Sequence, residues 1–219
     1  MVERARERRY DDPCGIARAL DLIGERWALL VVRELIHGPK RFTELRAGLG
    51  GISPNVLSQR LQSLSERGIL RRRHLGPPVS SDVYELTVLG DELEPVLLAL
   101  ARWGSRAIAP HGGELSDDAF VIALRTTISS VCPDGRFVLD MGTDRFTLEV
   151  ARGSLSSRRG VSGPTDATIS GSAASLRQVT FGGRPAAEAV AAGDIAIAGD
   201  EAAAVAFLDS FVRPTVIGA

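Results

Sequence analysis

The sequence predicts a mixed fold: a mainly α-helical domain over residues 1–110 and an α+β domain with an antiparallel sheet over residues 115–219. The first observation is length, because 219 residues exceed one average domain core. The second is a change in composition from Leu/Arg-rich to Ala/Gly/Ser/Thr-rich across Pro110–Glu114, a run of turn-forming residues. The third is the spacing of apolar residues, which is helical before this segment and partly alternating after it.

Helical spacing of apolar residues predicts four short helices in the first domain. They cover residues 16–23, 27–35, 42–47 and 54–67. The fourth is the best defined, because Ser53 offers a side-chain cap, Pro54 suits the first helical position, and Gly68 follows the end.

A hairpin and a long helix complete the first domain. Extended segments at 69–75 and 83–87 are joined by residues 76–82, which predicts a hairpin with a long tip. Apolar residues at helical spacing from Leu89 to Ala107 predict an amphipathic helix that is kinked near Pro95.

The second domain alternates helices with strands. Ser116 caps a predicted helix. Alternating apolar residues predict strands over 137–141 and 146–150, and shorter strands at 167–169 and 195–197. Helices are expected at 172–179, 185–192 and 201–213, on one side of the sheet.

Composition excludes several classes of protein. Apolar residues make up 44% and charged residues 24%, as in an ordinary globular chain rather than a disordered, collagen-like or coiled-coil one. No apolar run approaches the ~20 residues that cross a bilayer, and no apolar stretch follows the arginines of the first ten residues. Cys14 and Cys132 form neither a disulfide framework nor a metal-ligand pair. We therefore expect a cytoplasmic protein that does not contact membranes.

Positive charge is concentrated in one window. The whole chain has a formal charge of −1, but residues 40–80 hold eight basic and two acidic side chains. A local excess of this size attracts polyanions. The order helix, turn, helix, hairpin across the same window predicts a winged helix-turn-helix that binds double-stranded DNA.

The fourth helix has two faces. Leu57, Leu61 and Leu64 form a buried stripe, and Asn55 and Gln59 fall on the opposite side. Asn and Gln amides form bidentate hydrogen bonds with adenine in the major groove. The residues that we predict to contact DNA are Lys40, Arg41, Ser53, Asn55, Ser58, Gln59, Arg60, Gln62, Arg71, Arg72 and Arg73.

Strand alternation divides the three consecutive arginines of the hairpin between its two faces. We therefore expect two of them to contact phosphates or the minor groove, where they position the protein rather than select a sequence. The alternative is a winged helix used for protein contacts.

Four segments closely resemble the HxlR family of bacterial transcriptional regulators. They are CGIARALDLIGERW at 14–27, LIHGPKRFTEL at 35–45, GISPNVLSQRL at 51–61 and YELTVLG at 84–90. The resemblance covers about residues 10–108. It implies a homodimer assembled through the first and last helices of the domain, with one recognition helix per DNA half-site, acting as repressor or activator. Spare apolar surface at Leu98, Ala101 and Ile108 agrees with a dimer.

The segment AVAAGDIAIAGD at 189–200, followed by a predicted helix, is similar to the sterol carrier protein 2 (SCP2) fold. The resemblance covers about residues 116–213 and implies an apolar tunnel for a hydrophobic or amphipathic small molecule. The candidate tunnel walls are Phe137, Leu139, Met141, Phe146, Leu148 and Val150. The alternative is that these side chains fill an ordinary core.

Cys14 matches the amino-terminal cysteine through which some members of the HxlR family sense oxidants. The neighbouring Asp11 and Asp12 disfavour the reactive thiolate. No His, Cys or Asp spacing suits a metal, no loop suits a nucleotide, and no nucleophile has a nearby base, so we expect neither a cofactor nor an enzyme. The sequence thus predicts a ligand-responsive dimeric regulator. Alternatives are a lipid carrier whose winged helix only dimerises, and a regulator that senses oxidants through Cys14.

Overall fold

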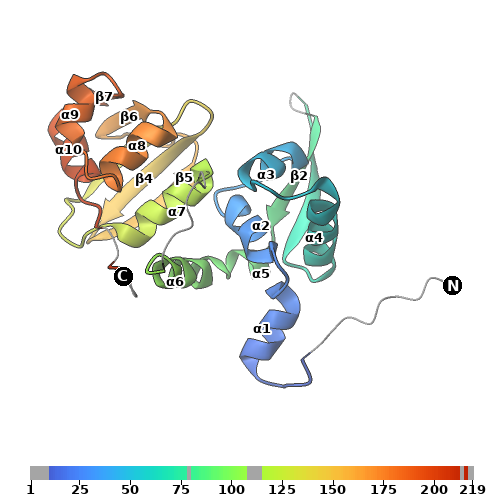
Figure 1. Cartoon of the computed structure of the whole chain (residues 1–219). Helices are drawn as coiled ribbons and strands as arrows, with labels where there is room; N and C mark the ends of the chain where they lie inside the picture. Colours follow the sequence, from blue (N-terminus) through green and yellow to red (C-terminus); the bar gives the residue numbers. More distant parts are fainter. Residues whose placement is uncertain (1–9, 78–79, 108–114, 213–214, 217–219) are drawn as a thin grey trace. The chain divides into compact units, whose positions relative to one another are not determined.

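The computed structural model describes residues 10–77, 80–107, 115–212 and 215–216, and it divides into two compact units, Met1–Leu93 and Glu94–Ala219 (Figure 1). The domain boundary that the sequence predicts at Pro110–Glu114 lies outside the described residues.

Unit 1 has the predicted order of helix, turn, helix and hairpin. Its elements are α1 (Gly15–Ile23), α2 (Ala28–Leu35), α3 (Phe42–Gly48), α4 (Pro54–Glu66), β1 (Leu70–Leu75), β2 (Ser81–Leu86) and α5 (Val88–Asp91). Strands β1 and β2 pair in antiparallel register, with Leu70 opposite Leu86. The winged helix-turn-helix prediction is confirmed at this level.

Local chemistry sets both ends of α4. The Ser53 hydroxyl accepts a hydrogen bond from the Val56 N–H at 3.3 Å, and Pro54 occupies the first turn. After the last turn, Gly68 adopts a φ of +71°, a left-handed conformation that suits glycine. Leu57, Leu61 and Leu64 then pack into the core together with α2.

The long helix predicted from Leu89 to Ala107 is two helices. Helix α5 ends at Asp91, and α6 (Glu94–Gly104) begins one residue before Pro95. Proline has no N–H to donate, so the first turn of a new helix accommodates it more easily than a helix interior does. The sequence predicted the position of the interruption near Pro95 correctly. It predicted a kink within one helix, however, whereas the chain forms two separate helices.

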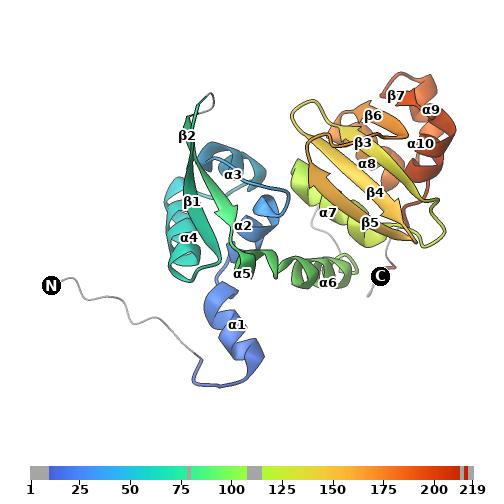
Figure 2. The same ribbon diagram turned by 180° about the vertical axis from the view of Figure 1, so that it is seen from behind.

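Unit 2 contains one five-stranded sheet with helices on one face. Besides α6, its elements are α7 (Asp117–Thr127), β3 (Gly135–Asp140), β4 (Arg145–Ala151), β5 (Ser154–Arg159), β6 (Ala167–Gly171), α8 (Ala173–Thr180), α9 (Ala186–Ala191), β7 (Ile195–Gly199) and α10 (Glu201–Leu208). The strand order is β5-β4-β3-β6-β7. Figure 2 shows the strands from the side opposite α7 and α8.

The sheet is mixed, which corrects the antiparallel prediction. Strands β3 and β6 are parallel neighbours, with Phe137 opposite Ala167, whereas the other three pairings are antiparallel. Side-chain alternation reports which face of a strand is buried but not which strand lies beside it, so the sequence did not reveal this pairing.

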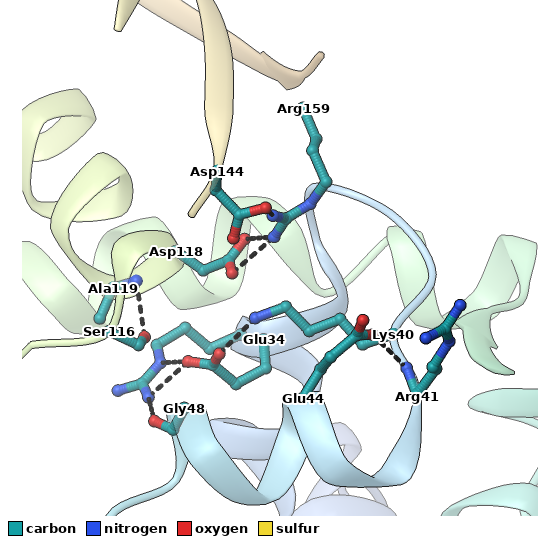
Figure 3. Close-up of polar contacts among 11 residues, drawn as sticks. Glu34, Lys40, Arg41, Glu44, Gly48, Ser116, Asp118, Ala119, Asp144 and Arg159 are labelled. Atoms are coloured by element: carbon teal, nitrogen blue, oxygen red, sulfur yellow. Dashed lines mark hydrogen bonds and ion pairs between the residues drawn. The ribbon is translucent and has the colours of Figure 1, made fainter. Parts of the chain in front are cut away.

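A buried ion pair joins α7 to β5. The Asp118 carboxylate is fully buried and accepts two hydrogen bonds from Arg159 Nη2, at 2.7 and 2.6 Å, and Arg159 also contacts Asp144 (Figure 3). The guanidinium lies over the Phe146 ring at 4.9 Å. These contacts make Arg159 part of the scaffold of unit 2.

No helix among the described residues is long and apolar enough to cross a membrane.

Candidate nucleic-acid interface

Helix α4 presents polar side chains on its outer face. Asn55, Ser58 and Gln59 are exposed, whereas the leucines opposite them are buried. Gln62 is also exposed, but its amide nitrogen donates to Glu66 Oε1 at 3.0 Å. Asn55 and Gln59 are therefore the amides of this helix that have no hydrogen bond within the described structure, while Ser53 is occupied as the cap.

The wing formed by β1 and β2 carries its basic residues on both faces. Arg71 and Arg73 share Glu85, at 2.7 and 2.8 Å. Arg72 and His74 share Asp82, with His74 Nδ1 at 3.0 Å from the carboxylate. This division follows the predicted strand alternation, and all four side chains stay largely exposed.

Hydrogen bonding from His74 and then from Arg72 lowers the pKa of the Asp82 carboxyl group below its usual value. The same carboxylate raises the pKa of Arg72, mainly through their hydrogen bond. Asp82 therefore stays charged and compensates part of the positive charge of the wing.

Ion pairs in the folded chain neutralise part of the positive charge that the sequence counts over residues 40–80. Four acids outside residues 40–80, namely Glu25, Glu34, Asp82 and Glu85, form ion pairs with basic residues inside it. A count along the chain misses these partners because they lie on strand β2, on helix α2 or in the turn between α1 and α2. The interface is thus basic, but by less than the sequence count indicates.

Lys40 is a correction to the predicted DNA contacts. It is only 7% exposed, and its Nζ lies 2.7 Å from Oε2 of the fully buried Glu34 (Figure 3). The other oxygen of Glu34 accepts from Arg33 Nη2 at 2.7 Å. Gly48 fits against this carboxylate, since a Cβ there would lie 2.1 Å from Glu34 Oε2. Lys40 holds α2 to the following segment, and its charge is already paired with Glu34.

Arg60, another predicted DNA contact, is largely buried, unlike Asn55, Ser58 and Gln59 on the same helix. Its side chain is only 14% exposed and contacts Glu25 at 3.3 Å. Arg67, the C-cap residue of α4, donates to the Leu22 carbonyl at 3.0 Å. These two arginines tie α4 to the end of α1, so Arg60 is better described as a residue that positions the helix.

Two exposed arginines lie at α3, one as its N-cap and one within the helix. Arg41, a predicted contact, precedes the helix and donates from Nε to Ser81 Oγ at 3.1 Å. Arg46 is not among the predicted DNA contacts, although it lies within residues 40–80 and is exposed on α3. Its position on the first helix of the motif was the signal that could have identified it.

The predicted tunnel walls of unit 2 are core residues. The side chains of Phe137, Leu139, Phe146, Leu148 and Val150 are buried in one cluster, with Met141 packed at its edge. Phe137 stacks on Phe207 with ring centroids 4.5 Å apart. An ordinary core needs this burial, so these residues give the ligand prediction no support.

Cys14 is exposed and caps α1, where its Sγ accepts a hydrogen bond from the Ala17 N–H at 3.3 Å. Cys132 is buried. Sensing through Cys14 stays a prediction. Within the described ranges, no group of three or more His, Cys, Asp or Glu residues could hold a metal ion.

The model of the HxlR-like helix-turn-helix family matches residues 22–112. The HTH-type transcriptional regulator YvaP of Bacillus subtilis is 34% identical over 93 residues, which are 42% of this chain and 86% of the relative. The regulator sll1512 of Synechocystis is 39% identical over 104 residues, covering 47% of this chain and 76% of the relative. The chain belongs to the HxlR-like helix-turn-helix family. This HxlR-like protein is therefore a transcriptional regulator with a helix-turn-helix DNA-binding region.

Two further similarities concern a solved structure and unit 2. The oxidized form of the redox regulator HypR is 32% identical to the HxlR-like chain, covering 44% of it and 100% of HypR, with a TM-score of 0.40. Residues 118–216 match the model described as alkyl sulfatase C-terminal. That description, and not sterol carrier protein 2, is the similarity found for unit 2.

Proposed function

We propose that this regulator is a cytoplasmic homodimer that binds a near-palindromic DNA operator, and that a small molecule bound by unit 2 changes its affinity. The exposed amide face of α4, beside a wing with four exposed basic side chains, carries the proposal. In this proposal Asn55 and Gln59 read adenine edges in the major groove, and the wing contacts phosphates or the minor groove.

Two helices supply exposed apolar surface for the dimer. On α1, Ile16 is 75% exposed and Leu20, one turn later, is also exposed. On α6, Val96, Leu100 and Trp103 form an exposed stripe. These residues differ from the apolar surface that the sequence predicted. Leu98 and Ala101 are half-buried, and Ile108 lies outside the described residues. A two-fold dimer would place recognition helices in half-sites ~34–36 Å apart.

A gel shift of this 219-residue chain with the promoter of its own gene, with and without cell extract, tests the function. We expect a discrete complex whose affinity the extract changes. A lipid carrier that uses its winged helix only to dimerise would form no specific complex, and native mass spectrometry would instead show a retained apolar ligand.

Gln59→Ala is expected to relax specificity at one base step by ~1–3 kcal/mol, because a bidentate amide contact is lost. Gln62→Ala, on the same helix, should have a smaller effect because its amide nitrogen is engaged by Glu66. Fluorescence anisotropy with an operator series substituted at each position measures both. An equal effect on all operators would contradict base reading by Gln59.

Arg72→Ala is expected to weaken binding to every DNA sequence. Log affinity should also fall less steeply with log salt concentration, the magnitude of the negative slope decreasing by about one. Arg145→Ala is the matched control, since Arg145 is 63% exposed and pairs with Asp140, as the 62% exposed Arg72 pairs with Asp82. The control should leave the slope unchanged. A loss confined to one operator would contradict a phosphate contact by Arg72.

A further inference from the structure

A pocket of about 440 Å³ lies in unit 2, at the carboxy-terminal ends of α8 and α10. Figure 1 shows these two helices next to α9. The apolar part of its lining is formed by Val179, Pro185, Leu208 and Phe211, and the charged part by Arg184 and Asp209. Its volume is within the ~300–1,000 Å³ of pockets that hold small molecules. It is separate from the side chains that the sequence predicted as tunnel walls.

The two charged residues of the pocket are not equivalent. Arg184 Nη2 lies 2.7 Å from Asp194 Oδ2, so its charge is compensated by a residue outside the lining. The Asp209 carboxylate accepts one hydrogen bond, from the Ala186 N–H at 3.2 Å, and it has no ion pair within the described part of unit 2. The three charged side chains therefore sum to −1.

The backbone adds negative potential at the same place. Thr180 is the last residue of α8, Leu208 is the last of α10, and both line the pocket. Carbonyl groups at a helix end carry a partial negative charge, which favours a cation and disfavours a carboxylate. Asp209 is nevertheless the C-cap of α10, and the last turn of that helix contains no basic residue. A carboxylate in this position is stabilised when a cation binds beside it.

We propose that this pocket binds an organic cation with an apolar chain, its ammonium group beside Asp209 and its chain against Val179, Leu208 and Phe211. The role of this cation as the effector of DNA binding rests on the function proposed above, whereas its binding to unit 2 does not.

Calorimetric titration of the full chain with octyltrimethylammonium and with octyl sulfate, both below their micelle-forming concentrations, tests the charge preference. The two probes share one alkyl chain and differ in the sign of the headgroup. We expect the cation to bind at least tenfold more tightly. Equal binding, or a preference for the sulfate, would overturn the proposal. Tetramethylammonium should bind much more weakly, and binding as tight as that of the long probe would also overturn it.

Two substitutions locate the site. Asp209→Asn keeps an oxygen that accepts the Ala186 N–H, so unit 2 should stay folded while cation binding weakens about tenfold. Arg184→Gln leaves Asp194 uncompensated and should leave cation binding equal or tighter. Unchanged binding in Asp209→Asn, or loss in Arg184→Gln with an unchanged circular dichroism spectrum, would contradict the assignment.

A third measurement separates this inference from the proposed function. We expect octyltrimethylammonium to change operator affinity in the wild type and not in Asp209→Asn. Cation binding without any change in operator affinity would support the pocket and remove its role as effector. Operator binding without cation binding would overturn the pocket alone.

Discussion

Glu34→Ala is expected to destabilise unit 1 by ~3–5 kcal/mol, one of the largest effects of a single substitution in this chain. Glu34 is fully buried, and its removal deletes the carboxylate that pairs with Lys40, which is itself only 7% exposed. Removing one partner of a buried ion pair costs far more than the intact pair contributes. Amide hydrogen exchange measured by mass spectrometry should show faster exchange in α2 and α3, with β3 and β4 of unit 2 as an internal control.

A double variant distinguishes loss of charge balance from loss of packing. Glu34→Leu combined with Lys40→Met removes both buried charges and keeps apolar volume, so most of the lost protection should return. Arg33 is 21% exposed and can then be solvated. If the double variant exchanges as fast as Glu34→Ala, the destabilisation does not come from loss of the Glu34–Lys40 ion pair.

Lys40 also illustrates what the sequence could not reveal. Along the chain it lies beside Arg41 in a basic window, and both residues look available to DNA. Their difference arises from Glu34, one turn and a loop earlier, whose burial depends on how α2 packs. Composition reports charge, but only tertiary structure reports which charges are already neutralised.

The parts that the sequence predicted well are those with local causes. The start of α4 follows from Ser53 and Pro54, its end from Gly68, and the division of the wing arginines from strand alternation. The parts that it missed depend on distant partners. Strand β5 was not predicted because Leu155 is its only apolar residue, so no alternation is visible in the sequence. The strand is defined by its pairing with β4.

Trp103→Glu is expected to dissociate the proposed dimer and to weaken operator binding by on the order of 10²-fold or more. Trp103 is 73% exposed, so its replacement should change the stability of one subunit by little. Two half-sites bound by one dimer gain affinity from the link between the two recognition helices, and this gain is lost when the subunits separate. Sedimentation equilibrium and fluorescence anisotropy with the operator measure the two effects.

The matched control is Val88→Glu, which introduces the same charge at an apolar residue that is 80% exposed on α5, outside the two helices assigned to the dimer. This variant should stay dimeric and bind the full operator normally. With a single half-site, Trp103→Glu should bind like the wild type, because α4 and the wing are unchanged. If instead Trp103→Glu remains dimeric, α6 does not hold the subunits together. If it becomes monomeric and still binds the full operator with wild-type affinity, recognition does not depend on two linked helices.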